Sequence, residues 1–156
     1  MGFDRIDLKI LDLLQRDATL PVARISDQVG LSQTPCWKRI QKHEEAGVIR
    51  ARVALLDPDA FGLHLTAFVL VEAPEPGPEW RQAFLALVEG MAPVRDIYRL
   101  AGPADFLLRV LVADMAAFDR FHTALTAGIP LRGVTALFAL ERVKVATTLP
   151  LATLSA

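Results

Sequence analysis

The chain has 156 residues, enough for one domain or for two small ones. It is 53% hydrophobic and 22% charged, with a mean hydropathy of +0.34, which excludes a disordered chain. No apolar run approaches the roughly 18 residues that a membrane-spanning helix needs, and the acidic N-terminal stretch is unlike an export signal, so we expect a cytoplasmic protein. The net charge of -1 argues against a uniformly basic nucleic-acid binder.

The charge is distributed unevenly along the chain. Residues 32–52 hold five basic and two acidic side chains, a local charge of +3. From residue 53 onward, eight basic side chains stand against eleven acidic ones, a balance of -3. The near-neutral total is therefore the sum of a basic segment and an acidic remainder, and only the basic segment is suited to nucleic acid.

Three helices are predicted in the first part of the chain. Apolar residues at helical spacing predict the first from about residue 3 to 14. Pro21 and Gly30 bound a second, short helix, since proline favours a helix start and glycine a helix end. Ser32 is a suitable N-cap for a third helix that runs to about Ala46, where the next residue, a glycine, can take the left-handed conformation.

A change of pattern follows the third helix. Residues 48–55 alternate apolar side chains with arginines and predict a short β ribbon, which completes a winged helix-turn-helix. Asp-Pro and Gly then interrupt the chain, so we place a linker at residues 56–64. The predicted domains are residues 1–55, for DNA binding, and residues 65–156, for ligand binding and oligomerisation.

The second part alternates strands and helices. Strands are predicted at 65–73, 94–101, 105–113 and 134–146, and helices at 79–91 and 115–128. The order β-α-β-β-α-β is the ferredoxin-like one, so the fold class is α+β. Such a sheet carries helices on one face only, and its other face is rich in Val, Leu and Phe. We therefore expect a dimer or higher oligomer.

The third predicted helix carries long polar side chains beside an apolar side. In a helix-turn-helix, the second of the paired helices enters the major groove of DNA and places its first residues at base edges. The candidate DNA contacts on it are Ser32, Gln33, Thr34, Trp37, Lys38, Arg39 and Lys42, with Arg50 and Arg52 beside the phosphates. The alternative is a solvated amphipathic helix, which the short preceding helix and the tight turn disfavour. Trp37 fits either the groove or the core, and Arg50 and Arg52 also fit ordinary solvated charges.

The sequence gives little support for a metal site or a catalytic site. One cysteine, Cys36, and three scattered histidines form no zinc-ligand set, so no metal and no cofactor are expected. A lone cysteine on a helix is more often a small buried hydrophobe than a reactive thiol. The ferredoxin-like fold also occurs in enzymes, but the second part offers only Asp105 with Tyr98 and scattered arginines. We expect a protein that is not an enzyme.

The segment AGPADF, residues 101–106, joins the two central strands. Free backbone N–H groups near Gly102 could hold a carboxylate, and Asp105 could pair with an ammonium group, which together suit an amino acid. A tight turn in which Asp105 is the hydrogen-bonding residue is the simpler interpretation of these residues alone.

The chain resembles the Lrp/AsnC (feast/famine) transcriptional regulators over nearly its whole length, in the motifs DRIDLKILDLLQRD, VGLSQTPCWKRI and AGPADFLLRV. Within that family, the chain is most similar to the DecR-like, cysteine-responsive branch. The resemblance implies a DNA-binding winged helix-turn-helix, a ferredoxin-like effector domain and dimers that assemble into octamers. It also implies binding of double-stranded operator DNA, and of a small amino acid, cysteine first, between neighbouring dimers. His43 departs from the leucine usual there, and residues 129–134 are one residue shorter than their counterpart.

The resemblance assigns roles to two sets of residues. The family's recognition-helix pattern falls on Ser32, Gln33, Thr34, Pro35, Trp37, Lys38 and Arg39. Its effector loop falls on Gly102, Asp105 and Phe106, with Tyr98, Leu100 and Ala101 lining the pocket and Thr135, Ala136 and Phe138 contributed by a neighbouring subunit. The alternatives are a regulator of another small or apolar amino acid and a ligand-independent protein that compacts DNA.

Overall fold

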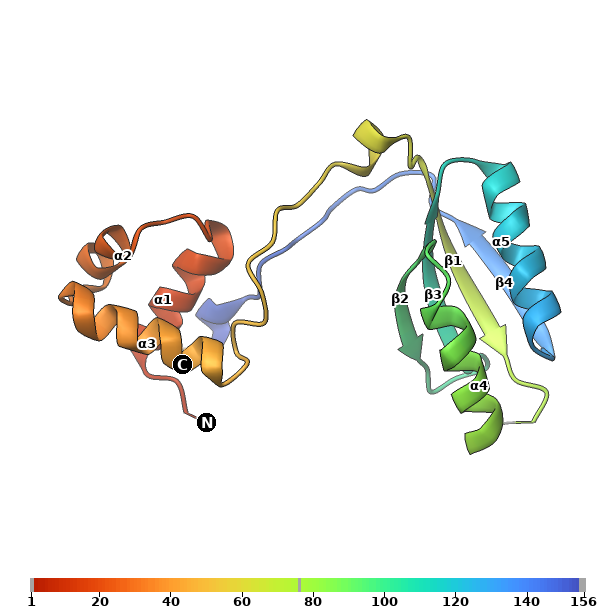
Figure 1. Ribbon diagram of the computed structural model, residues 1–156, viewed down its shortest axis with the longest axis horizontal. Coiled ribbons are helices and arrows are strands. Elements are labelled where there is room, and N and C mark those ends of the chain that lie inside the picture. Colours follow the sequence, from red (N-terminus) through yellow and green to blue (C-terminus); the bar gives the residue numbers. More distant parts are fainter. Residues whose placement is uncertain (1, 76, 155–156) are drawn as a thin grey trace. The chain divides into compact units, whose positions relative to one another are not determined.

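The computed structural model describes residues 2–75 and 77–154, which form two compact units. Residues up to Leu55, together with those from Val143 onward, make the first unit, and Leu56–Arg142 make the second. Figure 1 shows three helices in the first unit and a sheet with two helices in the second. Among the described residues, no helix is both long and apolar enough to cross a membrane.

The first unit contains the three predicted helices, α1 (Arg5–Arg16), α2 (Val22–Val29) and α3 (Gln33–Glu45). A capping box starts α1, since the Asp4 side chain accepts the backbone N–H of Asp7 and the Asp7 side chain accepts that of Asp4. Gly30 ends α2 and Gly47 follows α3, both with positive φ, as their sequence positions predict. The buried core of this unit is Ile10, Leu14, Ile25, Cys36 and Ile40.

The predicted β ribbon is not formed in this structure. Residues 48–55 contain no strand, and the backbone N–H groups of Val48 and Ile49 donate to the carbonyl of His43, at 2.9 and 3.1 Å, to close the turn after α3. Val53 and Leu55 are each 72% exposed. A ribbon requires a second strand beside the first, and no described segment pairs with this one. The prediction of a ribbon within one chain was wrong for that reason.

The C-terminal segment packs with the first unit, whereas the sequence suggested that residues 65–156 form one domain. The side-chain amide of Gln15 on α1 donates to the carbonyl of Leu149 at 3.0 Å and accepts the backbone N–H of Leu149 at 2.8 Å. The short 3-10 helix η2 (Leu151–Leu154) contacts α1. The first unit is thus built from two segments that are distant in the sequence.

The second unit has the predicted order of elements. A short 3-10 helix, η1, comes first, followed by β1, α4, β2, β3, α5 and β4. Their bounds are η1 (Pro58–Phe61), β1 (Leu65–Glu72), α4 (Pro78–Glu89), β2 (Val94–Arg99), β3 (Phe106–Val112), α5 (Met115–Gly128) and β4 (Gly133–Phe138). The four strands are antiparallel to their neighbours, in the spatial order β2-β3-β1-β4.

One face of the sheet forms the main core. Alternate residues of β1 and β3 are buried there with Phe84 and Val88 of α4 and Phe118, Phe121 and Leu125 of α5. The other face, which includes Phe68, Leu70 and Leu107, is only half-buried. β4 ends at Phe138, short of the predicted Ala146, because Phe138 pairs with Ala67 and β1 itself begins two residues earlier.

Candidate functional site

Helix α3 turns one side to the core and the other to solvent. Cys36, Ile40 and His43 are buried, at spacings of four and three residues. The exposed side chains of α3 include the expected DNA contacts Gln33, Thr34, Pro35, Trp37, Lys38 and Lys42. Trp37 is 47% exposed, which favours its interpretation as a solvent-facing aromatic residue over a core residue. Burial raises the pKa of the Cys36 thiol, as expected of a packing residue.

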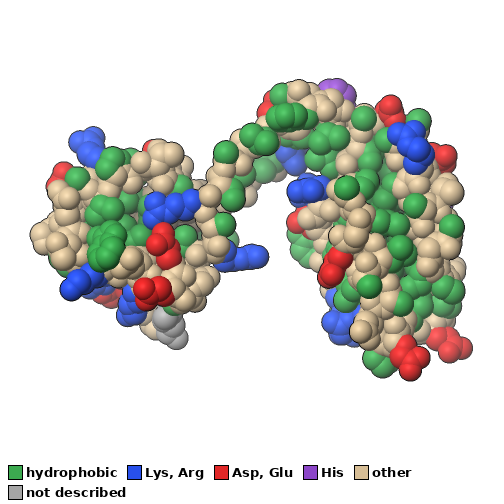
Figure 2. Space-filling model, in the orientation of Figure 1, with side chains coloured by type: hydrophobic (Ala, Val, Ile, Leu, Met, Phe, Trp, Pro, Cys, Tyr) green, Lys and Arg blue, Asp and Glu red, His purple; other side chains and the backbone are tan. Residues whose placement is uncertain are grey.

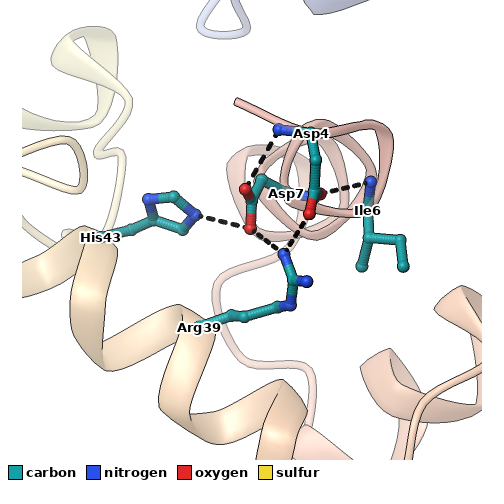
Figure 3. Close-up of polar contacts among 5 residues, drawn as sticks. All are labelled: Asp4, Ile6, Asp7, Arg39 and His43. Carbon is teal, nitrogen blue, oxygen red and sulfur yellow. Dashed lines mark hydrogen bonds and ion pairs between the residues drawn. The ribbon is translucent and has the colours of Figure 1, made fainter. Parts of the chain in front are cut away.

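Arg39 lies in an ion-pair cluster between α3 and α1 (Figure 3). One nitrogen of its guanidinium, Nη1, lies 2.7 Å from Asp4 Oδ2 and 2.7 Å from Asp7 Oδ1. The same carboxylates close the capping box of α1, since Asp4 Oδ1 also accepts the backbone N–H groups of Ile6 and Asp7. Arg39 therefore joins α3 to the start of α1, and its charge is already matched within the unit.

His43 belongs to the same cluster and is almost fully buried. Its Nε2 lies 3.2 Å from Asp7 Oδ1 without hydrogen-bond geometry, and its ring is tilted against that of Phe3 at 5.7 Å between centroids. A leucine, the residue usual in the resembled family, would pack but could not interact with Asp7. The histidine thus adds a polar contact to an otherwise apolar helix interface.

The Asp7 carboxylate should make the first unit sensitive to acid. Burial tends to raise the pKa of Asp7, but hydrogen bonds from Arg39 and from the backbone N–H of Asp4, together with the nearby His43 ring, outweigh it and hold the pKa below the ordinary 3.8. A depressed pKa contributes stability that is complete above 3.8 and is lost as pH falls through the folded-state value. We expect Asp7→Asn to destabilise the protein at pH 7 and to lose less stability than wild type on acidification below pH 4, in thermal melts by circular dichroism. An equal loss in both proteins would contradict this role.

The remaining candidate DNA contacts differ in their surroundings. Ser32 occupies the N-cap position of α3, but its side chain makes no capping hydrogen bond. Arg52 lies 2.8 Å from Glu44 Oε1 and also donates to the carbonyl of Ala18 at 3.4 Å. Arg50 is exposed. The exposed lysines Lys38 and Lys42 of α3, with Arg50, are the basic groups most open to DNA.

In the second unit, Asp105 fixes the connection between β2 and β3. Its Oδ2 accepts the backbone N–H of Ala73 at 2.8 Å, its own N–H donates to the carbonyl of Val71, and its carbonyl accepts the N–H of Leu100. The backbone of Asp105 thus closes the β2–β3 connection, whereas its side chain bonds to the segment after β1 and not within the turn. Gly102 is exposed and a Cβ there would meet no atom within 4 Å, so nothing in the chain itself requires glycine at this position.

A cavity of about 320 Å³ lies beside Asp105. It is lined by Asp105 and Phe106 from β3 and its approach, Arg99 at the end of β2, Ala73 after β1, and Gly77, Pro78, Trp80 and Arg81 around the start of α4. Trp80 stacks on Phe84 at 5.0 Å between ring centroids and is tilted against Phe106 at 6.2 Å. The cavity therefore has an aromatic wall and both signs of charge at its lining.

The structure brings only part of the expected effector set together. Asp105 and Phe106 share this cavity, and Leu100 and Ala101 lie in the loop before them. Tyr98 pairs with Leu107 and shares its half-buried sheet face. Thr135, Ala136 and Phe138 lie on β4, which β1 separates from β3. Phe138 packs edge-on against Phe118 at 4.9 Å, so within one chain it is part of the packing of α5.

Comparison with known proteins identifies both units. A model of the AsnC-type helix-turn-helix domain matches residues 3–42, and a model of the Lrp/AsnC ligand binding domain matches residues 66–149. The DNA-binding transcriptional activator DecR of Escherichia coli strain K12 is 44% identical over 149 residues, which cover 95% of this chain and 98% of DecR. The chain belongs to the Lrp/AsnC family. It is an amino-acid-responsive, DNA-binding regulator of transcription.

Two further relatives bear on this Lrp/AsnC regulator. The glutamate uptake regulatory protein of Zymomonas mobilis is also 44% identical, over 95% of this chain and 90% of its own. A transcriptional regulator of Neisseria meningitidis, solved as a complex with L-Met, has a TM-score of 0.92 and 34% identity, and the match covers 98% of this chain and 99% of that one. The fold and the two kinds of domain predicted from the sequence are confirmed by these matches.

Several residues that line the cavity of this Lrp/AsnC regulator were not predicted from the sequence. Arg81, Trp80 and Ala73 lie 20 or more residues before Asp105, and Arg99 lies on the neighbouring strand. The pairing of Arg99 with Phe106 in the predicted hairpin was the one signal that could have found any of them. Asp4 and Asp7 belong to the acidic N-terminal stretch seen in the sequence, but their contact with Arg39 depends on how α1 crosses α3.

Proposed function

We propose that this regulator reads operator DNA with the exposed side of α3 and binds a small amino acid beside the β2–β3 connection, with cysteine as the first candidate effector. The observation that carries the DNA-binding part is the side of α3 that exposes Gln33, Thr34, Trp37, Lys38 and Lys42. Such side chains contact base edges and phosphates from a recognition helix. Since its partner is DNA, we place its action in the cytoplasm, and we propose no enzymatic activity.

The effector assignment is supported by chemistry near Asp105. A carboxylate and two guanidinium groups line one cavity that is large enough for an amino acid. Cysteine comes first because of the resemblance to the cysteine-responsive branch. The relative named for glutamate uptake is equally identical to this chain, so sequence identity alone does not select the effector.

Oligomerisation is the second part of the proposal. The half-buried sheet face and the exposed apolar side chains of the segments around Leu55 and Leu140 would be covered by further copies of the chain. Figure 2 shows hydrophobic side chains on these connecting segments. We propose dimers that assemble into octamers, with Thr135, Ala136 and Phe138 reaching the effector from a neighbouring subunit. Paired reading helices would add avidity to a weakly basic DNA-binding unit.

A thermal-shift screen of all twenty amino acids, followed by gel-shift titration with any amino acid that binds, tests the proposal. A true effector at 100 times its Kd should stabilise the protein by about 2.7 kcal/mol. It should then change operator affinity by about 5- to 150-fold, which corresponds to a coupling of about 1 to 3 kcal/mol. A ligand-independent DNA-compacting protein would instead show no thermal shift with any amino acid and no specific footprint.

A further inference from the structure

Two arginines that form no ion pair with any described residue line the cavity beside Asp105. Arg81 and Arg99 both line it, and among residues 2–75 and 77–154 neither forms an ion pair. Elsewhere in the same unit, Arg109 pairs with Asp96 and Arg132 pairs with Glu72. Among the residues that line the cavity, the acidic side chain is Asp105.

Asp105 is the acidic group of this cavity, and half of its carboxylate is used by the fold. Oδ2 accepts the N–H of Ala73, while Oδ1 has no hydrogen bond to any described residue. The lining therefore combines two guanidinium groups with one partly engaged carboxylate, a formal charge of +1. An amino acid whose side chain is neutral has one carboxylate and one ammonium group. It would match Asp105 and one arginine, and the second arginine, which is exposed, would interact only with solvent.

Two aromatic side chains, Trp80 and Phe106, also line the cavity. Trp80 is held at both ends, because its ring stacks on Phe84 and its Nε1 donates to the carbonyl of Pro130 at 2.8 Å. Phe84 and Phe106 pack at 4.7 Å between ring centroids behind it. A fixed aromatic surface favours a compact ligand that packs an apolar part against it.

We propose that Arg81 and Arg99 make this cavity selective for an amino acid with a second acidic group. One guanidinium holds the α-carboxylate and the other holds the side-chain carboxylate, while Oδ1 of Asp105 accepts from the ammonium group. Guanidinium groups suit this role because they present paired N–H donors that match a carboxylate. This selectivity rests on the proposed regulator function. The resemblance alone puts cysteine first, whereas the charges that line the cavity of this chain put acidic amino acids ahead of it.

Calorimetry on the full chain with matched acid and amide ligands tests the selectivity. L-Glutamate against L-glutamine, and L-aspartate against L-asparagine, change the charge at nearly constant shape. We expect at least one acid to bind the wild-type protein 10-fold or more tightly than its amide, and more tightly than L-cysteine. One of the variants Arg81→Gln and Arg99→Gln should abolish the difference between acid and amide, and the other should weaken both ligands alike. Arg95→Gln, an exposed arginine of β2 outside the cavity, is the matched control and should change neither affinity.

Failure of the proposed selectivity and failure of the proposed regulator function would give different results. Equal affinity for acid and amide in the wild type, or tighter binding of cysteine than of either acid, overturns the selectivity and leaves an amino-acid regulator. Unchanged preference in both arginine variants also overturns it. If none of the five ligands binds and none of the twenty amino acids shifts the melting temperature, the proposed effector function itself fails. Circular dichroism of each variant shows whether its fold is retained.

Discussion

Lys38→Ala should weaken operator binding without lowering thermal stability, whereas Arg39→Ala should lower both. The two residues are neighbours on the recognition helix, but Lys38 is exposed while Arg39 binds Asp4 and Asp7 at 2.7 Å. Removing the guanidinium leaves Asp7, whose side chain is 11% exposed, without its strongest partner. The loss of such a hydrogen-bonded charge costs about 1 to 3 kcal/mol, and in a chain of this size each kcal/mol lowers the Tm by about 2 to 4 °C.

The measurement combines thermal melts with gel-shift titration at several salt concentrations. If Lys38 contacts a phosphate, Lys38→Ala should reduce the slope of log affinity against log salt by about 1. Lys9→Ala removes the same charge from an exposed position on α1 and serves as the control, with neither stability nor DNA affinity expected to change. An Arg39→Ala protein that melts like wild type but binds DNA poorly would show that Arg39 contacts DNA directly and that the ion pairs contribute little.

Asp105→Asn should abolish most of the amino-acid binding while leaving the fold intact. The amide keeps an oxygen that can accept the N–H of Ala73, so the connection between β1 and β3 is preserved. What it removes is the negative charge that would pair with the ligand's ammonium group. Hydrogen bonds to charged groups contribute about 1.5 to 3 kcal/mol, so we expect affinity to fall by about 10- to 150-fold in calorimetry.

Asp105→Ala extends the same experiment. It removes both the charge and the acceptor, so it should lose ligand binding and also lower the Tm, because the Ala73 N–H is then left without its partner. Glu72→Gln is the control, since Glu72 lies on the adjacent part of β1 but pairs with Arg132 outside the cavity. Ligand affinity in Asp105→Asn equal to that of wild type would place the ammonium group elsewhere.

Local patterns in the sequence were sufficient for most of the secondary structure. The helices of the first unit follow from apolar spacing, and their ends follow from Gly30 and Gly47, whose φ values are positive. The order of strands and helices likewise predicted a sheet with one covered face, and the residues of β1 and β3 are alternately buried and half-buried. These features are encoded by residues close together in the chain, so each can be predicted without knowing the rest of the fold.

Features that depend on distant pairing were missed or misplaced. A strand at residues 48–55 needs a partner strand, and β4 can extend only as far as β1 offers one. The role of Arg39 depends on how α1 crosses α3, and its positive charge alone suggested a DNA contact. Arg81 and Arg99 come from different elements, so no motif links them. The sequence shows which chemical groups are present, but which of them lie close together is determined by the tertiary structure.

The bidentate contact between Gln15 and Leu149 has a consequence for the order in which the protein can be assembled. A ribosome releases the three helices of the first unit early, but it adds Leu149 only after the whole effector domain has been synthesised. Because domains commonly fold as the chain emerges, the helices must wait for their last segment while the sheet folds between the two parts. The nascent regulator would therefore complete its ligand-binding domain before its DNA-binding unit is whole.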